Sequence, residues 1–386
     1  MLVTRLILRN WRNFRSVDVR LGKRCYLIGA NASGKSNLLD VFRFLRDVSR
    51  VSGGGLQKAV EQRGGITKLR CLQARADHTV RIEVHLSETA DDPEPAWKYA
   101  LAFKAEGKGA QRILLTEETI HRRDQPEPIL SRPDEADHRD SLRLTQTHLE
   151  QITSNAAFRE IAEHFQGTTY LHLVPQLLKH ADEISGRMLE DDPFGQGLLQ
   201  RIARTTPKTR DARLRRIRET LEKAVPQFSD LRFEKDEITG LPHLSACYQH
   251  WRPNGAWQRE DQFSDGTLRL IGLLWALQDG DGLLLLEEPE LSLNDAIVRH
   301  IPLMVDRVLR ARRSERQVMV STHSQTLMAE LADSRDVLLL EPTADGTRVR
   351  PANAEEQAQM AAGLNAAEVL LPKTRVQTAD QPGRFP

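Results

Sequence analysis

Hydrophobic and polar positions along the chain form two kinds of pattern. Short stretches that alternate apolar and polar residues, or that are apolar throughout, indicate β-strands, and apolar residues spaced three and four apart indicate helices. In the first 120 residues, strands are expected at 2–10, 17–21, 25–28, 79–86, 97–103 and 112–120. The helical spacing over 37–45 predicts a helix directly after the third strand.

The rest of the chain mixes both patterns. Residues 122–140 are dense in Pro, Asp, Glu and Arg, which predicts an exposed loop. Helices are expected at 158–165, 198–225, 268–277 and 297–312. Strands are expected at 169–174, 231–233, 243–251, 282–286, 317–323 and 337–340, followed by a short helix and a loose tail.

The stretch from Gly29 to Ser36 fits the phosphate-binding loop pattern G-x-x-x-x-G-K-[ST] at every fixed position. Backbone N–H groups of such a loop, together with the following helix N-terminus, bind anions. Lys35 is expected to reach the β- and γ-phosphates, and Ser36 to ligate Mg²⁺. A glycine-rich turn can match by chance, but the flanking strand and helix argue against that. The residues expected at the nucleotide are Gly29, Asn31, Ala32, Ser33, Gly34, Lys35, Ser36 and Asn37.

Two acids follow a fully apolar stretch later in the chain. Leu283–Leu286 is expected to be a buried strand of a parallel sheet, and Glu287 and Glu288 come directly after it. In an open α/β sheet, ligands bind at the C-terminal ends of the strands, so these acids are expected beside the phosphate loop. Glu287 would hold Mg²⁺ through water, and Glu288 would polarise the attacking water. The alternative is that both acids only cap a helix.

Bulk composition narrows the possible classes. A length of 386 residues suggests one large domain or two smaller ones, and the formal net charge of +1 argues neither for nor against a nucleic-acid partner. The three cysteines, Cys25, Cys71 and Cys247, are far apart and indicate neither a zinc site nor a disulfide framework. No apolar stretch approaches the roughly 20 residues of a membrane span, so a cytoplasmic protein without a membrane partner is expected.

One segment departs from this neutral balance. Residues 198–225 are strongly basic, which is compatible with a solvated helix pair or with a surface for the phosphate backbone of DNA or RNA. No aromatic residues are interleaved there, so any binding is expected to be weakly sequence-specific. The candidate contacts are Arg204, Arg210, Arg213, Arg215, Arg216 and Arg218.

The order of the motifs resembles one group of ATPases. A phosphate loop, a Ser-x-Gly turn before a helix, an apolar strand ending in acids and a strand ending in His323 follow one another. This order resembles the ABC-type, AAA-like ATPase heads of the RecF/SMC/OLD (overcoming lysogenisation defect) group, which are common in bacterial DNA-repair and phage-defence operons. The start, Leu8-Arg9-Asn10-Trp11-Arg12-Asn13-Phe14, resembles the L-x-N-F-R-N-F start of that group.

The resemblance covers roughly residues 1–85 and 160–345. It implies an α/β fold, namely a P-loop NTPase with an ABC-ATPase-like head. In that head a mixed sheet is flanked by helices, and a mixed or helical lobe is inserted. The expected domains are a head formed by 1–85 and 226–345, an inserted lobe at 86–225, and a short C-terminal helix with a loose tail at 346–386.

The resemblance also implies roles for particular residues. The Ser264 hydroxyl and the turn at Gly266 would grip the γ-phosphate of ATP bound to a second copy of the chain, which implies a nucleotide-sandwich homodimer. Ser-Asp-Gly before a helix is more often only an N-cap. His323 matches a histidine that senses the γ-phosphate, and Arg12 would contact phosphate or the adenine edge.

Some positions depart from the group's pattern. Glu287 stands where Asp is usual, Asn294 stands where a Leu-His-Pro is frequent, and the glutamine that contacts Mg²⁺ could be Gln62 or Gln73. Fewer than about fifty residues follow the last expected strand, too few for a nuclease domain of about a hundred, so any effector or nuclease is expected on a separate chain.

The expected function is that of a dimeric ATPase with ATP and Mg²⁺ as ligands, linked to DNA sensing or effector control in repair or phage defence. An ATP-gated scaffold that sequesters a partner and hydrolyses slowly is the alternative, and a transporter ATPase is disfavoured by the two strands before the loop.

Overall fold

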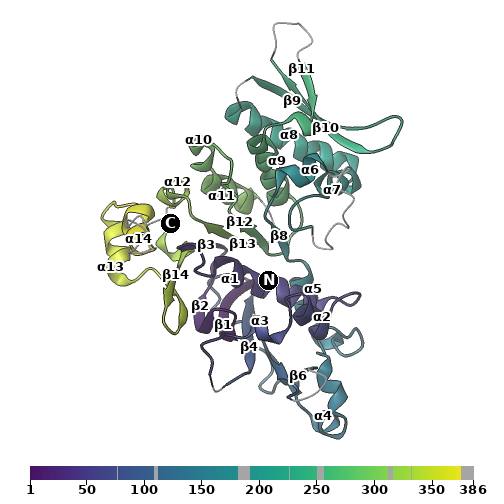
Figure 1. Ribbon diagram of the computed structural model, residues 1–386, viewed down its shortest axis with the longest axis vertical. Coiled ribbons are helices and arrows are strands. Elements are labelled where there is room, and N and C mark those ends of the chain that lie inside the picture. Colours follow the sequence, from purple (N-terminus) through teal and green to yellow (C-terminus); the bar gives the residue numbers. More distant parts are fainter. Residues whose placement is uncertain are drawn as a thin grey trace, which may run out of the picture. The chain divides into compact units, whose positions relative to one another are not determined.

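A computed structural model describes residues 1–75, 77–107, 112–180, 192–225, 227–249, 256–311, 316–331 and 333–374 (Figure 1). The chain forms two compact units. The first comprises Met1–Thr169, Asp281–Leu285 and Arg312–Pro386, and the second comprises Tyr170–Gly280 and Leu286–Ala311.

The first unit contains a six-stranded antiparallel sheet in the order β2-β1-β4-β5-β6-β7. Its strands are β1 (Leu2–Trp11), β2 (Phe14–Arg20), β4 (Val80–Ser87), β5 (Trp97–Ala105), β6 (Ile113–Arg122) and β7 (Leu130–Arg132). Alternation in β1 places Leu6 and Leu8 on the core face, opposite Val19 and Val17 of β2. All four are buried, and each such side chain stabilises the fold by about 1.5–3 kcal/mol.

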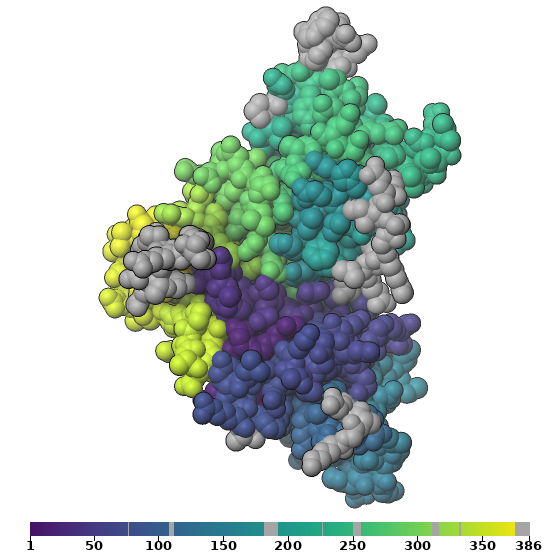
Figure 2. Space-filling model, in the orientation of Figure 1, coloured from purple at the N-terminus to yellow at the C-terminus, as the bar shows by residue number. Residues whose placement is uncertain are grey.

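A second sheet carries the phosphate loop. Its order is β15-β14-β3-β13-β12-β8. Its strands are β15 (Gly346–Pro351), β14 (Val337–Thr343), β3 (Arg24–Gly29), β13 (Val318–Thr322), β12 (Leu284–Glu287) and β8 (Thr169–Leu171). Strands β13 and β14 both run parallel to β3, so the loop leaves the C-terminal end of an inner strand. In Figure 2 the yellow C-terminal residues lie beside the purple N-terminal ones, as the pairing of β14 with β3 requires.

Helix α1 (Lys35–Ser49) packs against both sheets of the first unit. Its Phe44 ring lies 5.2 Å from Trp11 of β1 and 5.4 Å from Phe103 of β5, centroid to centroid. The other helices described in this unit are α2 (Leu56–Glu61), α3 (Ile66–Leu69), α4 (Glu135–Arg139), α5 (Arg159–Gln166), α12 (Gln325–Ala329), α13 (Ala354–Ala361) and α14 (Ala366–Thr374).

The second unit combines helices with a three-stranded antiparallel sheet, β11-β10-β9. Its elements are α6 (Pro175–Lys179), α7 (Leu198–Arg204), α8 (Pro207–Ala224), β9 (Phe228–Lys235), β10 (Pro242–Tyr248), β11 (Ala256–Arg259), α9 (Asp265–Gln278), α10 (Asp295–Val298) and α11 (Ile301–Ala311). Leu214, Ile217 and Leu221 form the buried stripe of α8, which packs on β9 and α9.

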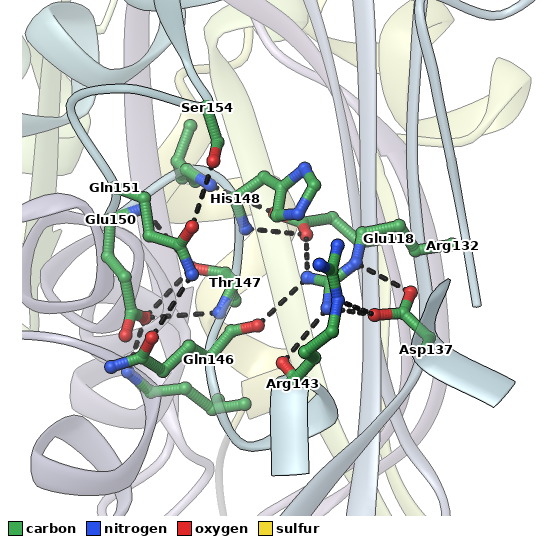
Figure 3. Close-up of polar contacts among 12 residues, drawn as sticks. Glu118, Arg132, Asp137, Arg143, Gln146, Thr147, His148, Glu150, Gln151 and Ser154 are labelled. Atoms are coloured by element: carbon green, nitrogen blue, oxygen red, sulfur yellow. Dashed lines mark hydrogen bonds and ion pairs between the residues drawn. The ribbon is translucent and has the colours of Figure 1, made fainter. Parts of the chain in front are cut away.

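The expectation of an exposed loop over 122–140 is only partly right. Most of these residues are exposed, but strand β7 and helix α4 lie there, and Arg132 is buried between two acids (Figure 3). Its guanidinium lies 3.1 Å from a Glu118 oxygen and 2.8 Å from an Asp137 oxygen, and all three side chains are at most 1% exposed. Proline and charged residues look like a solvated loop in composition, but here the charges neutralise one another inside the fold.

The basic stretch 198–225 is two helices, in line with the helix pair considered from its sequence, because Pro207 starts α8 as its first helical residue. Other boundaries differ from the sequence expectation. Strands β11 and β15 were not expected, and β15 pairs with β14 where the start of the loose tail was predicted. Residues 375–386 of that tail lie outside the described residues.

The compact units also divide the chain at positions other than the predicted domain boundaries. Residues 86–169, placed by the sequence in an inserted lobe, fall in the same unit as the phosphate loop. The assignment of 86–225 as one inserted module therefore stays a prediction, and it does not coincide with a compact unit.

Candidate functional site

The phosphate loop joins β3 to α1, as the sequence predicted. Lys35 is 6% exposed, and its Nζ donates to the carbonyl oxygens of Gly29 at 2.9 Å and Ala30 at 3.0 Å. The ammonium group therefore lies inside the curl of the loop. Ser33 is fully buried, and its Oγ makes no hydrogen bond to the described residues.

Two glycines give the loop its shape, each because neighbouring protein atoms leave no space for a side chain. Gly34 has φ of +100°, and a Cβ there would lie 2.1 Å from the Asn13 side chain. A Cβ on Gly29 would lie 2.5 Å from Ser33 Oγ and 2.7 Å from the Leu340 carbonyl oxygen.

Asn13, which the sequence argument gave no role, braces the loop. Its Nδ2 donates to the Ser33 carbonyl at 2.9 Å and to Thr347 Oγ1 at 2.8 Å. Its Oδ1 accepts from Asn37 Nδ2 at 2.8 Å. One amide thus ties together the loop, the first turn of α1 and strand β15.

Arg12 lies beside this brace and pairs with an acid of α1. Its Nη2 is 2.6 Å from Asp40 Oδ2, and Asp40 also accepts two bonds of 3.0 Å from Arg63. Burial alone would raise the pKa of Asp40, but the charges of Arg63 and Arg12 outweigh it and hold that pKa below its usual value. The structure thus anchors Arg12 to the helix that follows the loop.

His323 follows β13 and is exposed, and its Nδ1 lies 3.4 Å from Lys35 Nζ. The histidine and the lysine of the two motifs are therefore neighbours. Gln62 and Gln73 are both exposed: Gln62 ends α2, and the Gln73 side chain accepts from Cys71 Sγ at 3.1 Å. Nothing in these contacts distinguishes either as a ligand to a metal.

In the second unit, Glu287 ends β12 and Glu288 follows in a left-handed conformation with φ of +44°. The Tyr170 hydroxyl donates to Glu287 Oε2, and His172 Nδ1 lies 3.2 Å from the Glu287 carbonyl oxygen. Both residues come from β8 or directly after it, and motif reasoning missed them because neither belongs to a sequence pattern.

The Ser264–Gly266 turn begins α9. Ser264 is the N-cap, and its Oγ accepts from Thr267 N at 3.1 Å. A Cβ on Gly266 would lie 2.7 Å from the Ser292 carbonyl oxygen, so the turn packs closely on the segment after the acids. The structure thus supports the N-cap interpretation of Ser264. An N-cap can also contact a phosphate, so this does not conflict with the role that the family resemblance implies.

Asp265, the middle residue of that turn, is held by helix α6. Lys179 Nζ lies 2.8 Å from Oδ1, and Gln176 Nε2 donates to Oδ2 at 2.5 Å. The hydrogen bond from Lys179 lowers the pKa of Asp265. Gln176 therefore contacts the Ser264–Gly266 turn (the signature turn). No sequence motif had marked this glutamine.

A small pocket lies beside Glu287. It is lined by Leu171, Leu173, Arg269, Leu273, Leu286, Glu287 and Pro289. Burial lowers the pKa of Arg269, while the charges of Asp265, Glu288 and Glu290 oppose that shift. Arg269 of α9 therefore faces the acids after β12, a connection that sequence spacing does not reveal. Asn294, the departure from the group's pattern, caps α10 through Ala296 N.

The basic stretch is less available than its sequence suggests. Arg213 pairs with Asp279 at 2.7 Å, Arg218 pairs with Asp230 at 3.2 Å, and Arg210 lies over the Phe233 ring at 4.1 Å. These three arginines of α8 stabilise the second unit. Arg204, Arg215 and Arg216 are exposed, which leaves them as the candidate surface charges.

The chemistry of these residues fits a nucleotide with Mg²⁺. A buried ammonium inside a curled loop suits phosphate, and a serine hydroxyl with a carboxylate offers the hard oxygen ligands that Mg²⁺ prefers. No group of three or more His, Cys, Asp or Glu residues that could hold a metal ion occurs in the described part of the chain. Mg²⁺ commonly takes one or two carboxylates and completes its shell with phosphates and water, so this finding is compatible with the motif.

Fold and motif order define the class. A phosphate loop after β3, a histidine after β13 and an acidic pair after β12, on three successive strands of one sheet, make the fold that of a P-loop NTPase with an ABC-ATPase-like head. The chain belongs to the family described as "AAA domain, putative AbiEii toxin, Type IV TA system", which matches residues 26–329. No curated protein matches the chain.

Solved SMC heads share this fold. An SMC head bound to the C-terminal winged-helix domain of ScpA superposes with a TM-score of 0.55 at 17% identity, covering 92% of this chain and 99% of that one. An SMC head with an extended coiled coil, bound to the C-terminal domain of ScpA derived from Pyrococcus furiosus, gives 0.52 at 14% identity, covering 93% and 98%. None of the helices in the described residues has both the length and the hydropathy needed to cross a bilayer.

Proposed function

We propose that this chain is an ATPase whose two copies engage when ATP binds. The observation that carries the proposal is the buried Lys35, whose ammonium group lies inside the loop against the Gly29 and Ala30 carbonyl oxygens. A buried lysine surrounded by backbone groups, at the start of a helix, is arranged to receive a phosphate anion. Family membership supports a nucleotide as the ligand.

Each residue has one task in the proposal. Lys35 and the loop N–H groups neutralise the phosphates, and the loop residues Asn31, Ala32 and Ser33, with Asn37 of α1, shape the cradle around them. Ser36 and Glu287 hold Mg²⁺, which when bound supplies positive charge to the transferring phosphoryl group. Glu288 orients the attacking water, and His323, next to Lys35, senses the γ-phosphate.

Engagement of two copies rests on the signature turn. Ser264 and Gly266 begin an apolar helix whose N-terminus has positive dipole character, which favours a phosphate from a second copy. The SMC heads to which this fold is similar support this arrangement as an analogy of fold only. Engagement would couple ATP to an effector on another chain or to DNA, in repair or phage defence.

The test of catalysis measures phosphate release and nucleotide affinity for three proteins. Glu288→Gln should lower the rate by about 10²–10⁴-fold with unchanged ATP affinity, because only the orientation of water is lost. Lys35→Met should lower the affinity itself by at least about tenfold. Matched exposed controls, Glu330→Gln and Lys68→Met, should leave both quantities unchanged.

The same measurements distinguish an ATP-gated scaffold. If the wild type binds ATP but hardly hydrolyses it, and Glu288→Gln retains biological activity, the chain acts as an ATP-gated scaffold. Its function then depends on the ATP-bound state and not on ATP hydrolysis. If neither protein binds ATP, the proposal fails altogether.

DNA contact is tested separately on α8. Reversing Arg215 and Arg216 to Glu should weaken binding of a labelled duplex and flatten its salt dependence, because each phosphate contact releases counterions. Reversal of Arg123 and Arg139 to Glu on the first unit, both at exposed positions, is the charge-matched control. If the reversed variant binds the duplex as well as the wild type, or if the wild type does not bind it, this part of α8 is not a DNA-binding surface.

A further inference from the structure

Glu287 is held at two points by β8 and the residue that follows it. The Tyr170 hydroxyl donates to the Glu287 carboxylate, and His172 Nδ1 lies 3.2 Å from the Glu287 carbonyl oxygen. A carbonyl can only accept, so this contact is a hydrogen bond when Nδ1 carries the proton. We propose that Tyr170 is a positioning residue that fixes the Glu287 carboxylate in the orientation needed to hold Mg²⁺. This inference rests on the proposed function.

The length of the glutamate side chain makes such a contact necessary. Glu has one more methylene and one more rotatable bond than the Asp that the family resemblance leads one to expect, so its carboxylate has more rotamers to lose on binding. A hydrogen bond from a rigid tyrosine restricts those rotamers before the cation arrives. The conformational entropy of the Glu287 side chain is then lost when the chain folds and not when Mg²⁺ binds.

A tyrosine suits this task better than a basic residue would. Its hydroxyl is a neutral donor, which restrains an ionised carboxylate without adding a positive charge that would oppose a cation. The adjoining pocket is lined by four leucines and Pro289 together with Arg269 and Glu287 itself, and its apolar part strengthens a hydrogen bond.

The backbone around Glu287 is restrained as well. Directly after it, Glu288 turns to φ of +44°, so the chain leaves the strand at this point. Because the carboxylate and the carbonyl of Glu287 both contact β8 or the residue after it, loss of the tyrosine hydroxyl should remove one restraint on the side chain while the His172 contact to the backbone remains.

The test is the Mg²⁺ concentration needed for half-maximal binding of a fluorescent ATP analogue. Tyr170→Phe should raise this concentration at least about tenfold, the expected effect of losing a hydrogen bond to a charged group. Binding of the same analogue in EDTA should be unchanged, because the phosphate loop is intact. Tyr99→Phe is the matched control, since Tyr99 also donates to a buried glutamate, Glu118 at 3.5 Å, in the first unit.

A second variant separates positioning from general packing. In Glu287→Asp the shorter side chain cannot keep the tyrosine contact. Adding Tyr170→Phe to that variant should therefore raise the Mg²⁺ concentration for half-maximal binding by less than about twofold. An unchanged Mg²⁺ requirement in Tyr170→Phe, or an equal effect in both backgrounds, would overturn the inference while leaving the ATPase proposal intact. Absence of Mg²⁺-dependent binding in the wild type would overturn both.

Discussion

Residues with left-handed backbone conformations gather at the candidate motifs. Among the described residues other than glycine, seven have positive φ. Five of them are Asn10 and Arg12 in the start motif, Ala32 in the phosphate loop, and Glu288 and Ser292 after the acidic strand, and the other two, Asp192 and Gln227, lie elsewhere. Each such residue costs roughly 1–3 kcal/mol and persists only where its surroundings impose it. This clustering supports a functional role for these segments that is independent of motif matching.

Gly34→Ala tests how strictly the loop is built. The new methyl group would lie 2.1 Å from Asn13, and the backbone φ of +100° is unfavourable for alanine, so the brace by Asn13 must break. We expect ATP affinity to fall at least about tenfold and stability to fall by roughly 1–3 kcal/mol, measured by fluorescence titration and urea unfolding.

Gly240→Ala is the control for backbone strain alone, since φ is +71° and no atom lies within 4 Å of the added Cβ. It should lose stability by about 1 kcal/mol and keep full ATP affinity. Equal affinity of the two variants would contradict the account of the loop.

His164 gives the fold a pH dependence. Burial, with a smaller effect of the N-terminal charge, lowers its pKa to about 4, and its ring Nε2 is buried without a hydrogen bond to the described residues. The unfolded chain takes up this proton near pH 6.5 and the folded chain only near pH 4, so stability falls as the pH drops through this window.

Urea unfolding at pH 7 and pH 5 checks this sign. The wild type should lose about 1–2 kcal/mol more than His164→Gln over that interval. His138→Gln, at an exposed position, should behave as the wild type. A wild type that loses no more stability between pH 7 and pH 5 than the His164 variant would show that the ring is protonated in the fold.

At the scale of elements, the sequence predicted those strands and helices that follow from hydrophobic periodicity or from a fixed motif. Strands β1 and β4–β6 and the strand–loop–helix at Gly29 follow from alternation and from a fixed pattern, and all are present. Strand β7 and helix α4 were missed because their charged residues form ion pairs inside the fold, which composition cannot distinguish from a solvated loop.

The parts of the site that the sequence missed depend on contacts between distant segments. Tyr170 meets Glu287 across 117 positions, and Asn13 meets Thr347 across 334. Neither pair has a characteristic spacing. Gln62 and Gln73 were the candidate glutamines and neither has a clear motif, whereas Gln176, which contacts Asp265, follows a strand that neighbours β12.

The buried cluster around Arg132 should determine the stability of the β7–α4 region. Besides Glu118 and Asp137, Arg132 donates to the carbonyl oxygens of Gln146 and Arg143, and Glu118 accepts from two further backbone N–H groups (Figure 3). Arg132→Met leaves Glu118 buried without its counter-charge and leaves Asp137 only the half-exposed Arg143, 3.2 Å away, so we expect a loss of about 3–5 kcal/mol in urea unfolding.

Arg139→Met is the matched control, because Arg139 and its partner Glu135 are 77% and 91% exposed. That change should cost less than about 1 kcal/mol. A loss of similar size in both variants would mean that the buried cluster contributes no more than an exposed pair.

At the scale of the whole molecule, the candidate residues fall in two compact units. The phosphate loop and His323 belong to the first, and Glu287, Glu288 and the signature turn belong to the second. In the proposed dimer, the signature turn of one copy serves ATP bound by the other, so neither copy completes a site alone. ATP should therefore control assembly.

The most direct measurement is the mass of Glu288→Gln in solution, by light scattering, with ATP and Mg²⁺, with ADP, and without nucleotide. The account predicts twice the 43.8 kDa of one chain with ATP only, and one chain with ATP when Ser264→Arg is added. A mass that is the same in all three conditions, whether one chain or several, would contradict ATP-driven engagement.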